Sequence, residues 1–216
     1  MRTTLFSLAF CALATTAQAG NLEIKVLDKE GKLVPDAVVM LYPSKTGAAP
    51  VLLPTQATIR QEKFRFIPEL TVLATGSKVV FINHDSVDHH LRATPAGLSQ
   101  APTTVKQGFE LRLDGRLEGK ASSAAEVTLD AVGALLLSCH IHGSMRGHVY
   151  VADTPWTLKT EADGIAKFAG LPDGPLQLKV WHSDQLLELP RQVVQVGSSN
   201  APITLQLSVV PRRKRI

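Results

Sequence analysis

The residues best suited to chemistry lie in one short segment, residues 139–145, which reads Cys-His-Ile-His-Gly-Ser-Met. It combines a thiol at Cys139, an imidazole at His142 and a thioether at Met145. A lone thiol in an oxidising compartment tends to pair with another chain or to be oxidised, and a bound metal ion would protect it. Thiolate, imidazole and thioether together are the ligand types that select copper. The segment therefore predicts a soft metal site, with copper as the expected ion.

Residues 1–19 are typical of a secretory signal peptide. Arg2 supplies the positive start, an apolar stretch follows, and residues 17–19 form an Ala-Gln-Ala cleavage site. One of the two cysteines, Cys11, lies in this segment, so Cys139 is expected to be the sole cysteine of the exported chain and no intrachain disulfide is available. We therefore expect a periplasmic or secreted protein. No later apolar run reaches the roughly 18 residues of a membrane span, so we do not expect a transmembrane protein.

The charge balance excludes one class of partner. The chain has 23 Lys and Arg against 19 Asp and Glu, and cleavage would remove only Arg2. The small basic excess that remains does not indicate nucleic-acid binding. Residues 211–216 form a basic tail, which we expect to be a solvated end of the chain.

Short runs with the alternation of β-strands occur along the whole chain, and no helical period is present. Residues 22–27, 57–66 and 176–182 are examples. Residues 83–107 are polar and are predicted to be a long irregular loop. Turn signals about every ten residues favour β-sandwiches. The chain is therefore predicted to be all-β, with a Greek-key sandwich followed by a second, smaller sandwich.

Domain boundaries follow from the same pattern. Residues 153–156 are expected to separate a first domain, residues 20–152, from a second β-sandwich at residues 153–210. The core of the first domain is residues 56–152. Residues 20–55 are assigned to it as extra strands, and pairing of this segment with the C-terminal module is the open alternative.

The position of the Cys-containing segment suits a mononuclear copper site of the type 1 kind. Such a site needs two imidazoles and a thiolate, with a weak axial donor such as methionine. A β-sandwich can supply them at one end, with one histidine from a strand end and the other ligands from the loop between the last two strands. Residues 139–145 follow an apolar run at residues 134–137 and precede an alternating run at residues 147–151, as this arrangement requires. The remote imidazole would come from residues 80–91, which include a pair of adjacent histidines.

The spacing of these residues resembles that of the plastocyanin-like cupredoxins over roughly residues 56–152. The matching motifs are Phe-x-Asn-x5-His from Phe81 to His89, Cys-x2-His from Cys139 to His142, and Met-x-Gly-x-Val-x-Val from Met145 to Val151. The resemblance implies one copper ion bound by His89, Cys139, His142 and Met145, with Met145 axial. It also implies one-electron transfer to or from a redox partner protein. His90, where plastocyanins usually have Asn, is a substitute ligand for His89 in this interpretation.

A second resemblance covers most of the mature chain. The double histidine after Asn-x-Asp, together with Val-x-Asp-Thr-Pro from Val151 to Pro155, is similar to bacterial methylamine-utilisation-like proteins. These place a cupredoxin-like domain before a carboxypeptidase-regulatory-like sandwich of transthyretin-like or Ig-like type. The Leu-Pro-x-Gly motif at Leu171 and the Leu-x-Val-Trp-His motif ending at His182 match that second module. The resemblance implies a docking or spacing role for it.

One departure from the plastocyanin pattern leaves the fourth ligand open. Only two residues separate His142 from Met145, whereas plastocyanins have four. Without Met145 as a ligand, an open copper position would suit a small-molecule enzyme, and a copper carrier or storage protein would use the same residues. Zinc is the competing ion, but a structural zinc site wants a fourth firm N or S ligand and gains nothing from a thioether. No catalytic triad, phosphate loop or paired carboxylate is present, so no catalytic residue is predicted.

Several neighbouring residues are expected to support the site rather than bind metal. Asp85 and Asp88 are candidates to fix the imidazole tautomers, and Asn83 is expected to orient the segment. Trp181 is expected to lie in a core or between the domains. Three further histidines are expected to point away from the site and to be exposed: His84, His140 and His148.

Overall fold

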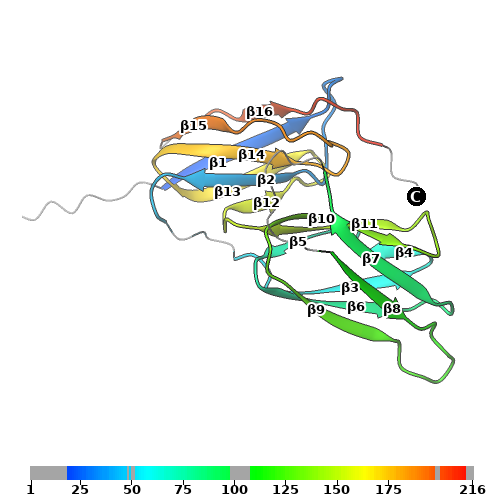
Figure 1. Cartoon of the computed structure of the whole chain (residues 1–216). Helices are drawn as coiled ribbons and strands as arrows, with labels where there is room; N and C mark the ends of the chain where they lie inside the picture. The colour runs from blue at the N-terminus through cyan, green and yellow to red at the C-terminus, as the bar shows by residue number, and fades with distance from the viewer. Residues whose placement is uncertain (1–18, 48, 50–51, 98–107, 198–199, 213–216) are drawn as a thin grey trace, which may run out of the picture.

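The computed structural model describes residues 19–47, 49, 52–97, 108–197 and 200–212, and these form sixteen strands and no helix. None of the described segments is therefore a helix long and apolar enough to cross a membrane. The strands form four sheets that make up two β-sandwiches (Figure 1). The prediction of an all-β chain with two sandwiches is confirmed. The predicted signal peptide lies outside the described residues except for Ala19, where the first strand begins.

One sandwich, which we call the flanking sandwich, combines strands from both ends of the chain and lies at the top of Figure 1. Its two sheets have the strand orders β13-β1-β16 and β12-β2-β14-β15. The strands are β1 (Ala19–Leu27), β2 (Val38–Pro43), β12 (Thr157–Lys159), β13 (Ile165–Pro172), β14 (Gly174–Trp181), β15 (Gln192–Val196) and β16 (Ile203–Gln206).

The other sandwich, which we call the inserted sandwich, contains every strand between β2 and β12 and is drawn in cyan and green in Figure 1. Its sheets have the orders β5-β11-β10-β7-β8 and β4-β3-β6-β9. The strands are β3 (Gln56–Glu62), β4 (Arg65–Ile67), β5 (Leu70–Ala74), β6 (Ser77–Asn83), β7 (His89–Pro95), β8 (Phe109–Leu113), β9 (Ala124–Leu129), β10 (Gly133–Cys139) and β11 (Arg146–Ala152).

Strand pairing decides where the N-terminal strands belong. β1 pairs antiparallel with β13 and parallel with β16, and β2 lies between β12 and β14. The sequence interpretation assigned residues 20–55 to the first domain. The strands in that range pair with C-terminal strands instead, which is the alternative that the sequence left open. The strand order therefore changes sandwich twice along the described chain, once between β2 and β3 and once between β11 and β12.

Each sandwich has its own apolar core, built by alternation along the strands. In the inserted sandwich, Leu135 and Leu137 of β10 and Val149 and Val151 of β11 point into one buried cluster. The flanking sandwich has a separate cluster that includes Ile24 of β1. Burial of branched aliphatic side chains on one face is the main force that fixes these strands in their sheets.

A third apolar cluster joins the two sandwiches. Its buried members come from β2, β11 and β14: Val38, Met40, Tyr150, Ala152 and Trp181. The rings of Tyr150 and Trp181 are 5.3 Å apart between centroids. The outward face of β11 is thus covered by the flanking sandwich, while its inward face belongs to the core of the inserted sandwich. Trp181 lies between the two sandwiches, in keeping with the expectation for this residue.

Two local predictions were wrong. Residues 57–66 were predicted as one strand, but a turn at Lys63 and Phe64 divides them into β3 and β4. The turn contains neither glycine nor asparagine, so the usual signal is missing. The predicted loop at residues 83–107 contains β7, which begins with the polar pair His89 and His90, and the inward-facing His89 disguises its alternation. Residues 98–107 of that loop lie outside the described residues.

Candidate metal centre

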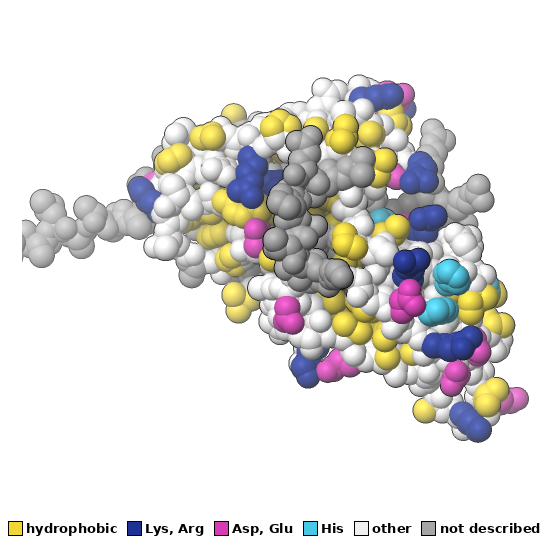
Figure 2. All heavy atoms as spheres, in the orientation of Figure 1, with side chains coloured by type: hydrophobic (Ala, Val, Ile, Leu, Met, Phe, Trp, Pro, Cys, Tyr) yellow, Lys and Arg dark blue, Asp and Glu magenta, His cyan; other side chains and the backbone are white. Residues whose placement is uncertain are grey.

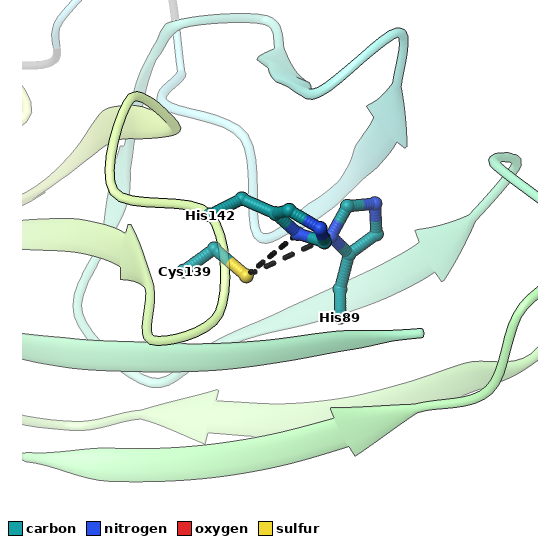
Figure 3. Close-up of side chains that lie close together, drawn as sticks. All are labelled: His89, Cys139 and His142. Atoms are coloured by element: carbon teal, nitrogen blue, oxygen red, sulfur yellow. Dashed lines mark hydrogen bonds between the residues drawn. The ribbon is translucent and has the colours of Figure 1, made fainter. Parts of the chain in front are cut away.

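Three of the predicted ligands meet at one end of the inserted sandwich. His89 is the first residue of β7, Cys139 is the last residue of β10, and His142 lies in the loop between β10 and β11. Cys139 is opposite Leu91 in the antiparallel pair of β7 and β10, so the end of one strand lies beside the start of the other. Figure 3 shows the three side chains pointing toward one another.

The ligand atoms are spaced as a single metal ion requires. The Nδ1 atoms of His89 and His142 are 3.1 Å apart, and the Sγ atom of Cys139 is 3.6 Å from each of them. The circle through three atoms at these separations has a radius of about 2.0 Å, close to the length of a metal–imidazole bond. The donor set therefore fits one ion bound by two imidazole nitrogens and one thiolate.

Of the three converging residues, His142 is the one that is partly exposed. His89 is fully buried, Cys139 is 3% exposed, and His142 is half-buried. Cys139 packs in the same apolar cluster as Leu91 and Leu137. Burying polar side chains costs free energy unless they have partners, and a bound cation would be a further partner for these donor atoms.

Asp85 fixes the orientation of His89. Its Oδ2 atom lies 2.9 Å from Nε2 of His89, and its carboxylate also accepts hydrogen bonds from the backbone N–H groups of Lys63 (2.6 Å) and Phe64 (3.0 Å). Burial alone would raise the pKa of Asp85, but the hydrogen bonds from Phe64, His89 and Lys63 outweigh it and lower the pKa below its ordinary value. An ionised carboxylate only accepts, so we assign the proton of His89 to Nε2. The lone pair on Nδ1 then faces Cys139 and His142.

The two carboxylates predicted near the site have different roles. Asp85 contacts His89 as expected, whereas Asp88 accepts a hydrogen bond from the backbone N–H of Gly115. Asn83 orients the segment between them. Its side-chain amide donates to the carbonyls of Val87, Leu113 and Asp114, and its Oδ1 atom accepts from the backbone N–H of Asp85. The strand end at β6 thereby holds Asp85 in position for His89.

Met145 closes the loop that carries Cys139 and His142. Its backbone N–H donates to the carbonyl of His142 at 3.0 Å, and its own carbonyl accepts from the N–H of Cys139 at 3.4 Å. Its side chain is buried in the same apolar cluster as Cys139. The loop is therefore short and closed at its base by backbone hydrogen bonds, and axial binding by Met145 stays a prediction.

His90 lies apart from the other three predicted ligands. Successive residues of a strand point to opposite faces, so His90 faces outward from β7 while His89 faces inward. Its Nε2 atom is 3.4 Å from Oε2 of Glu110, and its ring lies 5.7 Å from that of His140. Figure 2 shows histidine side chains together on this exposed face, beside charged residues. The structure thus brings His89, and not His90, to Cys139 and His142.

Two of the three histidines expected to be exposed are only partly exposed. His140 is exposed and His84 is half-buried, but His148 of β11 packs against Trp181, with ring centroids 5.6 Å apart. His148 does point away from the candidate site, as expected. The exposure prediction holds for His140 alone, and it fails for His148 because the outward face of β11 is covered by the flanking sandwich.

Phe64 was missed by the sequence interpretation. It lies in the turn between β3 and β4, and its ring meets the ring of His142 edge-on, with centroids 4.9 Å apart. Its centroid is 6.0 Å from that of His89. No motif in the sequence points to it, because the contact arises from the packing of a hairpin that the sequence did not indicate.

No protein-family model matches the sequence, and a search of curated proteins finds no similar chain. Solved structures do resemble it. A Cu-containing nitrite reductase (NirK) from Thermus scotoductus SA-01 is 21% identical, with a TM-score of 0.36. The match covers 52% of this chain and 25% of the reductase, so the chain spans a quarter of the reductase's length.

Two smaller proteins resemble it to a similar degree. A purple cupredoxin from Nitrosopumilus maritimus is 20% identical, with a TM-score of 0.34, and the match covers 44% of this chain and 99% of the cupredoxin. Amicyanin from Paracoccus versutus is 21% identical, with a TM-score of 0.33, and the match covers 53% of this chain and 97% of amicyanin. The structural neighbours of the chain thus include cupredoxins at low sequence identity.

Proposed function

We propose that this chain is an exported protein that binds one copper ion and transfers single electrons to or from a redox partner protein. The observation that carries the proposal is the convergence of Nδ1 of His89, Nδ1 of His142 and Sγ of Cys139 at the end of a β-sandwich. Two imidazoles and one thiolate are the equatorial ligands of electron-transfer copper sites.

The donor chemistry favours copper over zinc. Three donors converge in the described site, and the residue that completes the motif is Met145, a thioether. A structural zinc ion is bound by four N, S or carboxylate ligands, whereas a weak thioether suits copper. When bound, copper would supply the one-electron couple.

The chain's own residues favour electron transfer by holding the donors still. Asp85 fixes His89, the strand ends fix Cys139, and two backbone hydrogen bonds close the loop that carries His142. A donor set that cannot rearrange keeps a similar geometry in both oxidation states, so little reorganisation opposes the movement of an electron. The half-buried ring of His142 is the side through which we expect electrons to pass.

Location and partner are part of the proposal. The signal-like pattern of residues 1–19 supports a periplasmic or secreted protein. A periplasmic redox protein would then be the partner. The carboxypeptidase-regulatory-like resemblance of the C-terminal strands supports a docking or spacing role for the flanking sandwich.

The test is to add Cu(II) to the metal-free protein and to record the visible spectrum and the reduction potential. We expect an intense band at about 600 nm, from a short copper–thiolate bond, and a reversible one-electron couple. The Cys139→Ser variant should lose the band entirely. In the uncleaved full chain, the Cys11→Ser variant, which removes the other thiol, should keep it.

Other outcomes would replace the proposal. Tight binding of Cu(I) without the band or a reversible couple would indicate a copper carrier or storage protein. Catalytic turnover of an added small molecule at the copper would indicate an enzyme. A band that persists in Cys139→Ser would place the site elsewhere in the chain.

A further inference from the structure

The turn that carries Phe64 has an unusual backbone. Lys63 and Phe64 both have positive φ angles, 53° and 56°. Two-residue hairpin turns with this conformation normally use Asn and Gly, because a Cβ atom is disfavoured there. A bulky aromatic residue in this region is rare, and rare backbone conformations of this kind cluster at functional sites.

The turn is tied directly to the candidate metal site. The two N–H groups that it presents, from Lys63 and Phe64, both donate to the carboxylate of Asp85. The same carboxylate binds Nε2 of His89. One partly buried carboxylate, that of Asp85, therefore holds both the strained turn and one of the three converging residues, and this fixes the ring of Phe64 relative to the site.

The ring of Phe64 lies over the open side of the site. It meets His142 edge-on at an interplanar angle of 76° and His89 at 86°, and both are favourable arrangements for aromatic rings. Phe64 remains 46% exposed. A core residue would be more deeply buried, so the ring lies between the imidazoles and the solvent.

We propose that Phe64 is a positioning residue that covers the imidazoles of His142 and His89 and keeps small molecules away from the donor atoms. This inference rests on the proposed metal site. It also favours electron transfer over the enzyme alternative, because a covered site would hinder a small substrate from reaching the metal.

The first test uses the metal-free full chain in a Cys11→Ser background, so that Cys139 is the sole thiol. The rate of reaction with 5,5′-dithiobis(2-nitrobenzoate) then reports access to Cys139. We expect Phe64→Ala and Phe64→Gly to raise the rate by about tenfold or more, because thiol reactivity follows exposure. The far-UV circular dichroism of each variant should match that of the parent chain.

A matched control distinguishes the effect of losing the Phe64 ring from the effect of relaxing the backbone of the turn. Lys63→Gly relaxes the strained backbone but keeps the ring, so the rate should stay within about twofold of the parent rate. Phe64→Leu, which keeps apolar bulk, should give a smaller rise than Phe64→Ala. An equal rise in Lys63→Gly and Phe64→Ala, or no rise in Phe64→Ala and Phe64→Gly, would overturn the proposal.

The second test uses the copper-loaded protein and azide as the probe. The spectrum of the parent protein should not respond to azide, whereas that of Phe64→Ala should shift. If the spectra of parent and variant respond equally to azide, the proposal that Phe64 keeps small molecules away from the donor atoms is wrong. Failure of every variant to bind copper would instead contradict the proposed function, and the thiol test would still decide the role of Phe64.

Discussion

Two histidines of the same five-stranded sheet have opposite environments. His89 begins β7, is fully buried, and has a carboxylate on one ring nitrogen and two donor atoms near the other. His148 lies on β11 and faces Trp181 across the junction between the sandwiches. Burial is the main cause that lowers the pKa of His148 to about 4, and the carboxylate of Asp184 opposes this.

The difference shows what makes a buried histidine a candidate ligand. Burial, as the largest cause, lowers the pKa of the His148 imidazole and so favours its neutral form. A metal-binding histidine also needs an oriented ring, and Asp85 orients the ring of His89. It further needs other donor atoms close enough to bind the same ion, and His142 and Cys139 provide these.

The largest effect is expected at the junction between the sandwiches. Trp181→Ala removes the aromatic side chain that packs against Tyr150 and His148, so the free energy of unfolding should fall by about 3–5 kcal/mol. Urea unfolding of the metal-free protein, followed by far-UV circular dichroism, measures this loss.

The control lies on the same sandwich. Val193 is 74% exposed, and Val193→Ala should change the unfolding free energy by no more than about 0.5 kcal/mol. A loss in Trp181→Ala as small as that of the control would show that the two sandwiches do not stabilise each other through this cluster.

The next effect is a pH dependence that comes from His148. Its pKa falls from 6.5 in the unfolded chain to about 4 in the folded protein. Below pH 6.5 the unfolded chain therefore binds more protons, and stability should decrease as the pH falls from 6.5 toward 4. The loss from this one group amounts to about 3 kcal/mol at most.

The variant His148→Gln isolates this contribution. The charges and polar groups around His148, which include Asp184, His182, Arg146 and Arg212, stay the same in the variant. The parent carries His148 and the variant does not. The unfolding free energy of the parent minus that of the variant should therefore decrease steadily as the pH is lowered through this range. The exposed His140→Gln serves as the control and should follow the parent. A constant difference for His148→Gln would mean that the His148 pKa is not lowered.

The sequence predicted much of this arrangement. The Cys-x2-His spacing and the flanking apolar runs placed Cys139 and His142 in a loop between two strands, and the structure has that loop. The choice of His89 came from the family resemblance, and the alternation of β7 explains it physically. His89 and His90 must face opposite sides, and only one side is the core.

What the sequence did not predict depends on contacts between distant segments. Alternation in β1 shows which face is buried but not that its neighbours are β13 and β16. The burial of His148 depends on the position of the flanking sandwich. The turn at Lys63 and Phe64 contains no glycine or asparagine to indicate it, because hydrogen bonds to the distant Asp85 hold its conformation. Local sequence contains none of this information.

The smallest predicted effect tests the feature that distinguishes His89 from His148. Asp85→Asn removes the carboxylate that orients His89 while keeping the size of the side chain. Residues that orient a metal-binding histidine typically contribute a factor of about 10–100 in affinity. We expect a loss of that size in copper affinity, measured by competition with a chelator of known affinity.

Asp88→Asn is the matched control, because Asp88 lies in the same loop but hydrogen-bonds to the backbone N–H of Gly115. Its copper affinity should stay within about threefold of the parent value. Equal losses in the two variants would indicate a general effect of negative charge near the cation. A selective loss in Asp85→Asn would show that the orientation of His89, more than its burial, makes it a ligand.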